Sequence, residues 1–396
     1  MPISHKIERY VQEGGWIRRM FEAGIALKLQ HGEDKVFDLS LGNPVVEPPP
    51  EFRQELRRLA EDPLQGMHRY MPNAGYAETR EAVANGLRQE TGIAFSASDI
   101  VMTCGAAGAL NVVLKTLLDP GDEVVILSPY FVEYGYYVEN HGGKPVVVPT
   151  DASFQLDLDR IETALTNRTR AVILNSPNNP SGAVYPAHAI KALGELLARA
   201  TARRGNEIFL VSDEPYRRII YDGLTYPQVY PHYEKSIVVH SHAKDLALPG
   251  ERIGYIAVNP DCPDRGRLVD GFTFCNRILG FVNAPALMQH IVRALQGVTV
   301  DIADYQRKRD YMHGHLVEMG YSVTRPKGAF YLFPQSPIKD DARFVDELQR
   351  WNVLTVPGRG FGTPGYFRIS YCVEDRVLEG SLEGFHQAAR KHGLPG

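Results

Sequence analysis

Seven short runs of apolar residues, separated by segments with helical spacing, occupy the middle of the chain. The runs are continuous in Val, Ile and Leu rather than alternating, which is typical of strands buried on both faces of a sheet. They lie at residues 99–103, 123–127, 145–148, 171–174, 208–211, 237–239 and 253–258. Helical segments between them, such as residues 187–203, imply right-handed crossovers. The pattern predicts an α/β fold whose large domain, residues 52–280, has a mainly parallel seven-stranded sheet covered by helices.

The pattern changes after residue 280. A long helix is followed by short strands at 322–324 and 330–333, a helix at 341–351 and a strand at 367–370. We expect residues 281–396 to form a smaller α+β domain. The N-terminal segment, residues 1–51, is expected to contribute to this small domain and to the pocket.

Composition excludes several classes of protein. With 396 residues, 44% hydrophobic and 23% charged, the chain is long enough for two globular domains. Its net charge of −4 provides no basic field for nucleic acid. The first residues lack the apolar core of a signal peptide, and no stretch reaches the ~20 apolar residues of a membrane span. The four cysteines lie far apart without metal-binding spacing, so we expect a cytoplasmic protein with neither disulfides nor a metal site.

Polar turns that contain Gly, Pro or charged residues follow five of the predicted strands. They occupy residues 104–108, 128–131, 178–182, 213–216 and 241–244. In an open α/β sheet, ligands bind outside the carboxyl ends of the strands. Because these ends meet at one edge, the sequence predicts a single site for an anionic, aromatic, carbonyl-bearing ligand.

Lys244 is the candidate reacting group of this site. It follows the apolar run 236–240, and Arg252 comes eight positions later. A lysine has an ordinary pKa of about 10.4, and burial beside another cation lowers that pKa and frees the amine for Schiff-base formation. A single lysine at a strand end is more often a solvated surface charge. Because four other polar turns are predicted at the same edge of the sheet, we favour the interpretation of Lys244 as a Schiff-base former.

Other turns offer groups for a phosphate. Gly105 and Ala106 begin a helix after a strand, so their backbone amides and the helix dipole favour an anion, although a simple tight turn has the same residues. Ser241 adds a hydroxyl donor and Arg252 a bidentate cation to the same phosphate.

Further residues suit an aromatic ring. Asp213 could hold a ring nitrogen protonated, while Asn179 and Tyr216 could donate to a phenolate oxygen. Phe131 would stack on one face of the ring, and Pro215 would close the other. The alternatives are an ordinary helix cap at Asp213 and a core position for Phe131.

These motifs give the chain a resemblance to the fold-type-I pyridoxal-phosphate aminotransferases, class I/II, of the aspartate aminotransferase superfamily. The segment 241–244 with Arg252 resembles that family's Schiff-base signature, residues 179–182 its Asn-Pro-x-Gly turn, and Asp213 with Tyr216 its pyridine-binding pair. The match runs from residues 41–44 through 70–75 to 367–370, and so covers nearly the whole chain.

The resemblance implies pyridoxal 5'-phosphate as cofactor and transamination between an L-amino acid and a 2-oxo acid as reaction. Lys244 would hold the cofactor and then shift the proton, Asp213 would keep the ring nitrogen cationic, and Tyr216 would tune the phenolate. Arg368 would pair with the substrate carboxylate, helped by Asn179 and Gly42. The implied cofactor-binding set is Gly105, Ala106, Ala107, Phe131, Asn179, Asp213, Tyr216, Ser241, Lys244, Arg252 and Tyr70.

Two of the implied residues act across a subunit boundary. Tyr70 resembles the family tyrosine that reaches the cofactor phosphate of the neighbouring subunit, which implies a homodimer with composite active sites. Arg277 lies near the segment that supplies a cation to a substrate's distal carboxylate in some members. Within one chain, Tyr70 could instead be a packed aromatic.

The sequence departs from the family pattern at positions that concern the substrate. Ala106 and Ala107 follow Gly105 where some aspartate-using relatives have a lysine, and Phe131 stands where many have a tryptophan. Arg18 and Arg19 belong to the N-terminal segment that can line the pocket, although solvated helix charges are the alternative.

Two other functions remain open from the sequence. The same scaffold can run elimination, replacement, cyclisation or racemisation in a biosynthetic pathway, because these reactions differ only in which bond at Cα breaks and where the proton returns. A non-catalytic binding module is the second alternative. It would not need Lys244, Asp213 and Arg368 together.

Overall fold

The seven predicted runs form one sheet in the described chain, which comprises residues 2–13 and 15–395 of the computed structural model. The strand order is β2-β8-β7-β6-β5-β3-β4, and β8 runs antiparallel to both neighbours whereas the other pairs are parallel. The predicted mainly parallel sheet is therefore confirmed. Its strands are β2 (Ile100–Thr103), β3 (Glu123–Ser128), β4 (Lys144–Pro149), β5 (Thr169–Asn175), β6 (Phe209–Asp213), β7 (Ser236–Ser241) and β8 (Gly254–Val258).

Helices cover both faces of this sheet because alternate residues of each central strand point to opposite sides. In β5, Val172 and Leu174 enter one hydrophobic cluster, while Ala171 and Ile173 enter another. The first face packs against α3 (Pro50–Glu61), α4 (Ala77–Thr91), α7 (Leu158–Ala164), α8 (Ala187–Arg204) and α11 (Ala286–Ala294). The second packs against α5 (Gly105–Leu117), α6 (Tyr134–Asn140) and α10 (Arg265–Ile278).

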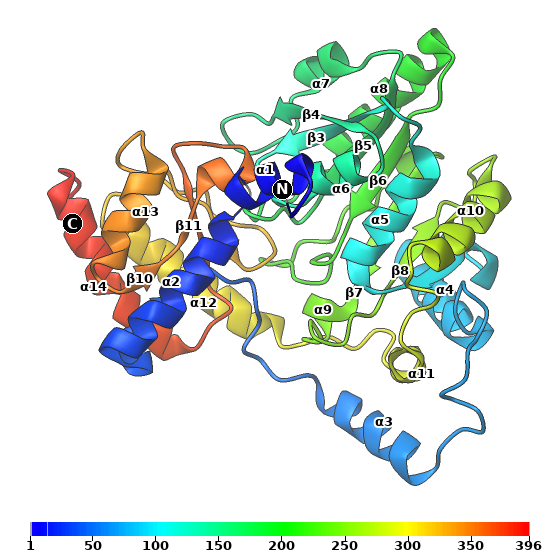
Figure 1. Cartoon of the computed structure of the whole chain (residues 1–396), viewed down its shortest axis with the longest axis horizontal. Helices are drawn as coiled ribbons and strands as arrows, with labels where there is room; N and C mark the ends of the chain where they lie inside the picture. Colours follow the sequence, from blue (N-terminus) through cyan, green and yellow to red (C-terminus); the bar gives the residue numbers. More distant parts are fainter. Residues whose placement is uncertain (1, 14, 396) are drawn as a thin grey trace.

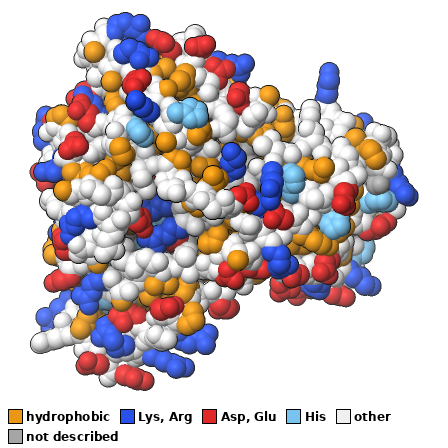
Figure 2. Space-filling model, turned by 180° about the vertical axis from the view of Figure 1, so that it is seen from behind, with side chains coloured by type: hydrophobic (Ala, Val, Ile, Leu, Met, Phe, Trp, Pro, Cys, Tyr) orange, Lys and Arg blue, Asp and Glu red, His pale blue; other side chains and the backbone are white. Residues whose placement is uncertain are grey.

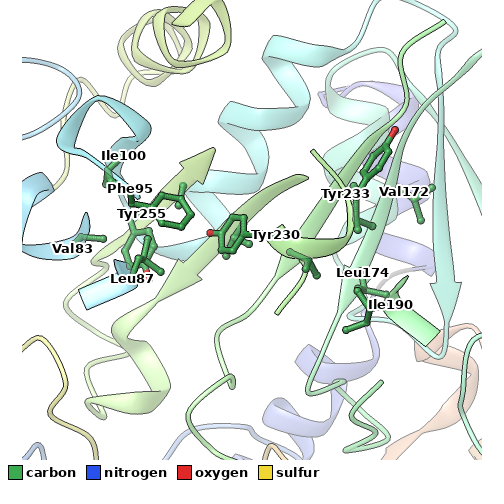
Figure 3. Packing of buried hydrophobic residues seen from close by; sticks show 14 of the residues in the cluster. Val83, Leu87, Phe95, Ile100, Val172, Leu174, Ile190, Tyr230, Tyr233 and Tyr255 are labelled. Carbon is green, nitrogen blue, oxygen red and sulfur yellow. The ribbon is translucent and has the colours of Figure 1, made fainter. Parts of the chain in front are cut away.

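Aromatic rings fill part of the first core near the end of the sheet formed by β2 and β8. Phe95 meets Tyr230 edge to face, with ring centroids 4.8 Å apart, and Tyr255 lies nearby (Figure 3). Val172 and Leu174 lie farther along the same core with Ile190 of α8 (Figure 3). This packing fixes the sheet against α8 and so positions the strand ends that carry the candidate site.

The small domain has its own sheet and core, at the other end of the molecule (Figure 1). Three short antiparallel strands have the order β11-β12-β9, and β1 pairs with β10. Met20 and Leu39 of the N-terminal segment are buried in this core. The elements are α1 (His5–Glu13), α2 (Trp16–His31), β1 (Phe37–Asp38), α12 (Ile302–Glu318), β9 (Tyr331–Leu332), α13 (Asp341–Gln349), β10 (Val353–Leu354), β11 (Val356–Pro357), β12 (Phe367–Ser370) and α14 (Asp375–Lys391), with α9 (His242–Asp245) in the large domain.

Two local predictions in this region are wrong. Residues 322–324 form no strand in the described chain, because the segment lacks a ladder partner and makes a single backbone bond from Gln335 N to Ser322 O, 2.8 Å long. The long helix after residue 280 is two helices. Gly297, with φ of 87°, breaks the chain direction, and the carboxylate of Asp301 caps α12 by accepting from Ala303 N at 2.9 Å.

The packing of α11 bears on the division between domains. Met288, Ile291 and Leu295 belong to the cluster on the first face of the large sheet, whereas Val300 belongs to the small-domain core. The change of core therefore favours a division between Leu295 and Val300, later than residue 280.

The surface carries charges of both signs. Lys and Arg side chains are interspersed with Asp and Glu over the face in Figure 2, and the hydrophobic side chains there are scattered. No helix in the described ranges is long and apolar enough to cross a membrane.

Close packing at Gly194 of α8 generates a prediction about stability. A β-carbon there would overlap the main-chain carbonyl of His232, whereas one at Gly314 of α12 would meet no atom within 4 Å. We expect Gly194→Ala to lower the free energy of unfolding by about 1–3 kcal/mol. The matched control Gly314→Ala should raise it by about 0.5–1 kcal/mol, since alanine is the better helix former. Urea unfolding of both variants measures this, and equal effects of the two would contradict it.

Candidate active site

A cavity of about 220 Å³ lies at the carboxyl edge of the large sheet, where β9 and β12 of the small domain close it. Most of the predicted site residues line it. They are Gly42, Ala106, Ala107, Phe131, Asn179, Asp213, Tyr216, Ser241, Lys244, Arg252 and Arg368, and Pro215 joins them.

Some predicted residues lie outside the lining. Gly105 lies next to a lining residue, since a β-carbon at this position would be 3.1 Å from Nη2 of Arg252. Tyr70 is 89% exposed, and Arg277 is exposed on α10, so neither reaches the cavity of its own chain. Arg19 is exposed and contacts the ring of Trp16 at 4.9 Å, while the side chain of Arg18 lies outside the described residues.

Lys244 projects into the cavity from α9, a four-residue helix. Ser241 caps this helix, since its Oγ accepts from Ala243 N at 3.2 Å. Nζ of Lys244 donates to the carbonyl of Gly42 at 2.6 Å. The pKa of Lys244 is lowered to about 8, mainly by burial; Cys372 opposes this lowering, and Arg368 and Arg252 contribute to it. The amine is therefore much closer to its reactive neutral form than an ordinary lysine.

Asp213 is the last residue of β6. One of its carboxylate oxygens accepts a hydrogen bond, and the other has no hydrogen-bond partner in the described chain. Oδ2 accepts from the hydroxyl of Tyr134 at 2.5 Å. Oδ1 is buried, and within the described chain it has no hydrogen-bond partner. Burial raises the pKa of Asp213 to about 7, and the bond from Tyr134 opposes this. A cationic N–H group in the cavity would satisfy Oδ1 and keep the carboxylate ionised.

An anion-binding corner lies beside these residues. Helix α5 begins at Gly105, which has φ of 70° and takes a conformation suited to glycine. The β-carbon position of Gly105 lies 3.1 Å from Arg252 Nη2 and 3.5 Å from Ser241 Oγ. The helix amides, a hydroxyl and a guanidinium therefore converge on one point, which suits a phosphate.

Arg368 lies on the opposite wall, on β12, and is 2% exposed. Nη1 donates to Oδ1 of Asn179 at 3.1 Å and Nη2 to the carbonyl of Ser40 at 2.5 Å. The guanidinium lies between two rings, 4.7 Å from that of Tyr331 and 4.8 Å from that of Phe361. A guanidinium fixed in this way presents a planar fork for a carboxylate.

Three further polar residues of the lining were not predicted from the sequence. Tyr134 binds Asp213, and the hydroxyl of Tyr331 lies 3.0 Å from that of Tyr216. Asn175 donates from Nδ2 to the carbonyl of Asp213 at 2.9 Å and accepts at Oδ1 from the backbone of Asn179 at 2.8 Å. Asn175 could have been predicted as a site residue, because it is a polar residue at the carboxyl end of a predicted strand. Tyr331 lies within an apolar run, so no feature of the sequence marks it as a site residue.

Comparison with known proteins adds an independent finding. The model of the family "aminotransferase class I and II" matches residues 34–384. An aspartate/prephenate aminotransferase from Thermus thermophilus is 35% identical over 367 residues, which are 91% of this chain and 92% of that protein. A probable aspartate/prephenate aminotransferase from Thermus aquaticus is 34% identical and covers 92% and 94%. The crystal structure of an amino transferase from Eubacterium rectale has a TM-score of 0.96 and 37% identity, and covers 99% of this chain and 100% of that one.

The lowered pKa of Lys244 predicts its reactivity. In protein free of small-molecule ligands, acylation of Lys244 by a small amine reagent should reach half its maximal rate near pH 8, whereas an ordinary lysine with a pKa of about 10.4 is almost entirely protonated there. Peptide mass spectrometry after brief labelling across a pH series measures this. A midpoint for Lys244 above pH 9.5 would contradict the buried, cation-flanked environment described above.

Proposed function

The chain belongs to the class I and II aminotransferase family, and from this premise we propose that the cavity carries out transamination with Lys244 as its reacting amine. Enzymes of this family move an amino group between an amino acid and a 2-oxo acid and use pyridoxal 5'-phosphate. The observation that carries the proposal is that Lys244 and Asp213 line the same cavity and that Oδ1 of Asp213 has no partner in the described chain.

The residues present fit this cofactor. Asp213 Oδ1 lacks the donor that a pyridinium N–H would supply, and the corner at Gly105, Ser241 and Arg252 suits the phosphate. Phe131 and Pro215 would flank the ring, with Asn179 and Tyr216 at its oxygen. When bound, the cofactor supplies an aldehyde carbon that carries the amino group and a cationic ring that withdraws electrons from the donor's Cα.

Lys244 has two tasks in this proposal. Its amine would hold the cofactor covalently, and after the donor's amine replaces it, the free Nζ would take a proton from the donor's Cα and return it during the transfer. A pKa near 8 suits both, because Nζ can accept and release a proton near neutral pH. Asp213, whose ionised form is favoured by the bond from Tyr134 and by a cationic ring N–H, would hold the ring nitrogen protonated.

Arg368 would bind the α-carboxylate that amino and oxo acids share. Its fork is already oriented by Asn179 and Ser40, and its burial excludes competing water. Among the described lining residues, the cations are Lys244, Arg252 and Arg368, and each already has a role. A second substrate carboxylate would therefore need a cation from outside this lining.

A second copy of the chain could provide that cation. Tyr70 is 89% exposed and Arg277 is exposed beside Phe274 and Ile278, which are 57% and 50% exposed. Large exposed apolar side chains of this kind favour association. We infer a homodimer in which Tyr70 reaches the neighbour's phosphate corner and Arg277 reaches the distal end of its substrate.

The reaction itself is tested with purified protein, the cofactor and a panel of amino donors. Before any donor is added, we expect borohydride to attach the cofactor to Lys244, as peptide mass analysis would show. After the donor is added, we expect 2-oxo acid to form and the cofactor to become its amine form. Lys244→Ala should lower turnover by about 100-fold or more, since it removes the proton carrier. Lys191→Ala, an exposed lysine on α8, is the control. Donor consumption without oxo acid, or label on another lysine, would overturn the proposal in favour of the other reactions open to this scaffold.

Arg277 gives a prediction about specificity. If it pairs with a distal carboxylate across the dimer, Arg277→Ala should lower kcat/KM for aspartate and glutamate by about tenfold or more, because a charge-assisted pair is lost. Neutral donors should be unaffected. Arg267→Ala, on the same helix and with its side chain 89% exposed, is the matched control. Equal kinetics of the Arg277 variant and wild type with every donor would remove Arg277 from the site.

A further inference from the structure

A buried cluster of two histidines and one carboxylate lies behind Lys244, outside the cavity lining. His240 is the penultimate residue of β7, and His242 and Asp245 are the first and last residues of α9. Their exposed fractions are 0%, 2% and 0%. Oδ2 of Asp245 lies 3.1 Å from Nε2 of His240 and 3.3 Å from Nδ1 of His242. Transamination as described above uses none of the three side chains.

His240 connects the two chain segments that carry the reacting groups. Its Nδ1 lies 2.9 Å from the carbonyl oxygen of Glu214, the residue after Asp213. Its Nε2 lies 3.1 Å from the carboxylate of Asp245, the residue after Lys244. The imidazole therefore spans from the end of β6 to the end of α9.

The hydrogen-bond geometry fixes where the protons are. A carbonyl oxygen only accepts, so Nδ1 of His240 carries a hydrogen. A neutral imidazole has one N–H, which would leave Nε2 bare against the Asp245 carboxylate, and two acceptors cannot bond to each other. A second proton must therefore lie between Nε2 of His240 and Oδ2 of Asp245. His240 and Asp245 are therefore either an imidazolium paired with a carboxylate or a neutral imidazole paired with a protonated carboxyl group.

Charged neighbours favour this proton over a metal ion at the cluster. Arg218 Nη1 lies 3.8 Å from Oδ2 of Asp245, and a guanidinium at that distance repels a divalent cation. Arg218 also pairs with Glu90, as does Arg217, and the ring of Tyr255 packs against both histidines.

The charge state of the cluster follows from its surroundings. Burial opposes ionisation of Asp245, but His242 and His240 together hold its pKa well below the usual range. Burial likewise lowers the pKa of His240 to about 4, against the opposing effect of Asp245, so a second proton on the imidazole depends on its contacts with Glu214 and Asp245.

We propose that His240 is a positioning residue, which through its bonds to Glu214 and Asp245 fixes the backbone of Lys244 relative to that of Asp213. Helix α9 has four residues, too few to hold its own position, so its location depends on tertiary bonds. Two backbone bonds join α9 to other segments, from His242 N to Ile253 O at 3.1 Å and from Val300 N to Asp245 O at 2.8 Å. The β6–β7 ladder pairs Asp213 with Val239, and His240 extends this connection from the ladder to α9.

This role deepens the proposed function and rests on it. The transfer needs the Lys244 amine and the Asp213 carboxylate at fixed places on one cofactor, and small displacements of such groups reduce rates steeply. Because the connection runs through main-chain and side-chain atoms behind the cavity, its loss should reduce turnover and leave the carboxylate fork at Arg368 intact.

His240→Phe tests the proposal because it keeps the ring and loses both bonds. We expect kcat per bound cofactor to fall about 10- to 100-fold with KM nearly unchanged, and the visible circular dichroism of the bound cofactor, which reports its orientation, to change. His240→Asn is the second variant should the first fail to fold. It can still donate to Glu214 O but is too short to reach Asp245, and the same direction is expected.

Two further variants separate positioning from plain packing. Asp245→Asn should stay within about threefold of wild type, because its amide can donate to two neutral imidazoles and so preserves the connection. His242→Phe, equally buried and bonded to the same carboxylate but without a bond to Glu214, is the matched control and should stay within about twofold.

Three outcomes would overturn the proposal. One is kcat per cofactor near that of wild type in His240→Phe, with only the melting temperature reduced, since that would make the histidine a packing residue. The second is a loss in Asp245→Asn as large as in His240→Phe. The third is one equivalent of metal in the purified protein that disappears in Asp245→Asn. Failure of the proposed function would appear separately, as wild-type protein that yields no oxo acid, while the dichroism of the variants would still report the connection.

Discussion

The parallel pairing of β5, β6 and β7 is the constraint on which the rest of the structure depends. Pairing of Asn175 with Asp213, and of Asp213 with Val239, puts the carboxyl ends of the three strands side by side. Each strand then turns at the same edge and places a polar group over it. The helices on both faces bury nearly all residues of these strands, so their register is fixed by apolar packing far from the polar groups.

Burial at that edge explains the chemistry of the site. Removing a charge from water is unfavourable, and each of the three charged groups has a specific partner. The half-buried Lys244 has Gly42, and the buried Asp213 and Arg368 have Tyr134 and Asn179. The compensation is incomplete at Asp213, whose Oδ1 remains unpartnered in the described chain. The lowered pKa of Lys244 and the raised pKa of Asp213 are two results of the same low-dielectric surroundings.

The small domain completes the cavity from the other side. Arg368 reaches it from β12, and Gly42 reaches it from the segment after β1. A side chain at Gly42 would overlap the hydroxyl of Tyr331, so this approach of backbone to ring requires glycine. The site therefore belongs to both domains. The His240 connection is the counterpart on the large-domain side, because it joins two neighbouring strand ends behind the reacting amine.

The sequence alone predicted the seven strands of the large sheet and the turns after them, including those with Lys244 and Asp213, because apolar runs and turn chemistry are local properties. Arg368 followed only from the family resemblance, and it lines the same cavity as Lys244 and Asp213. Tertiary structure decided what depends on contacts between distant segments. Tyr134 meets Asp213 across 79 positions and Tyr331 meets Tyr216 across 115, and no local pattern marks such pairs. The missing strand at 322–324 was also a tertiary outcome, since the segment lacked a ladder partner. The split of the long helix is different, because Gly297 and the capping residue Asp301 are local features of the sequence.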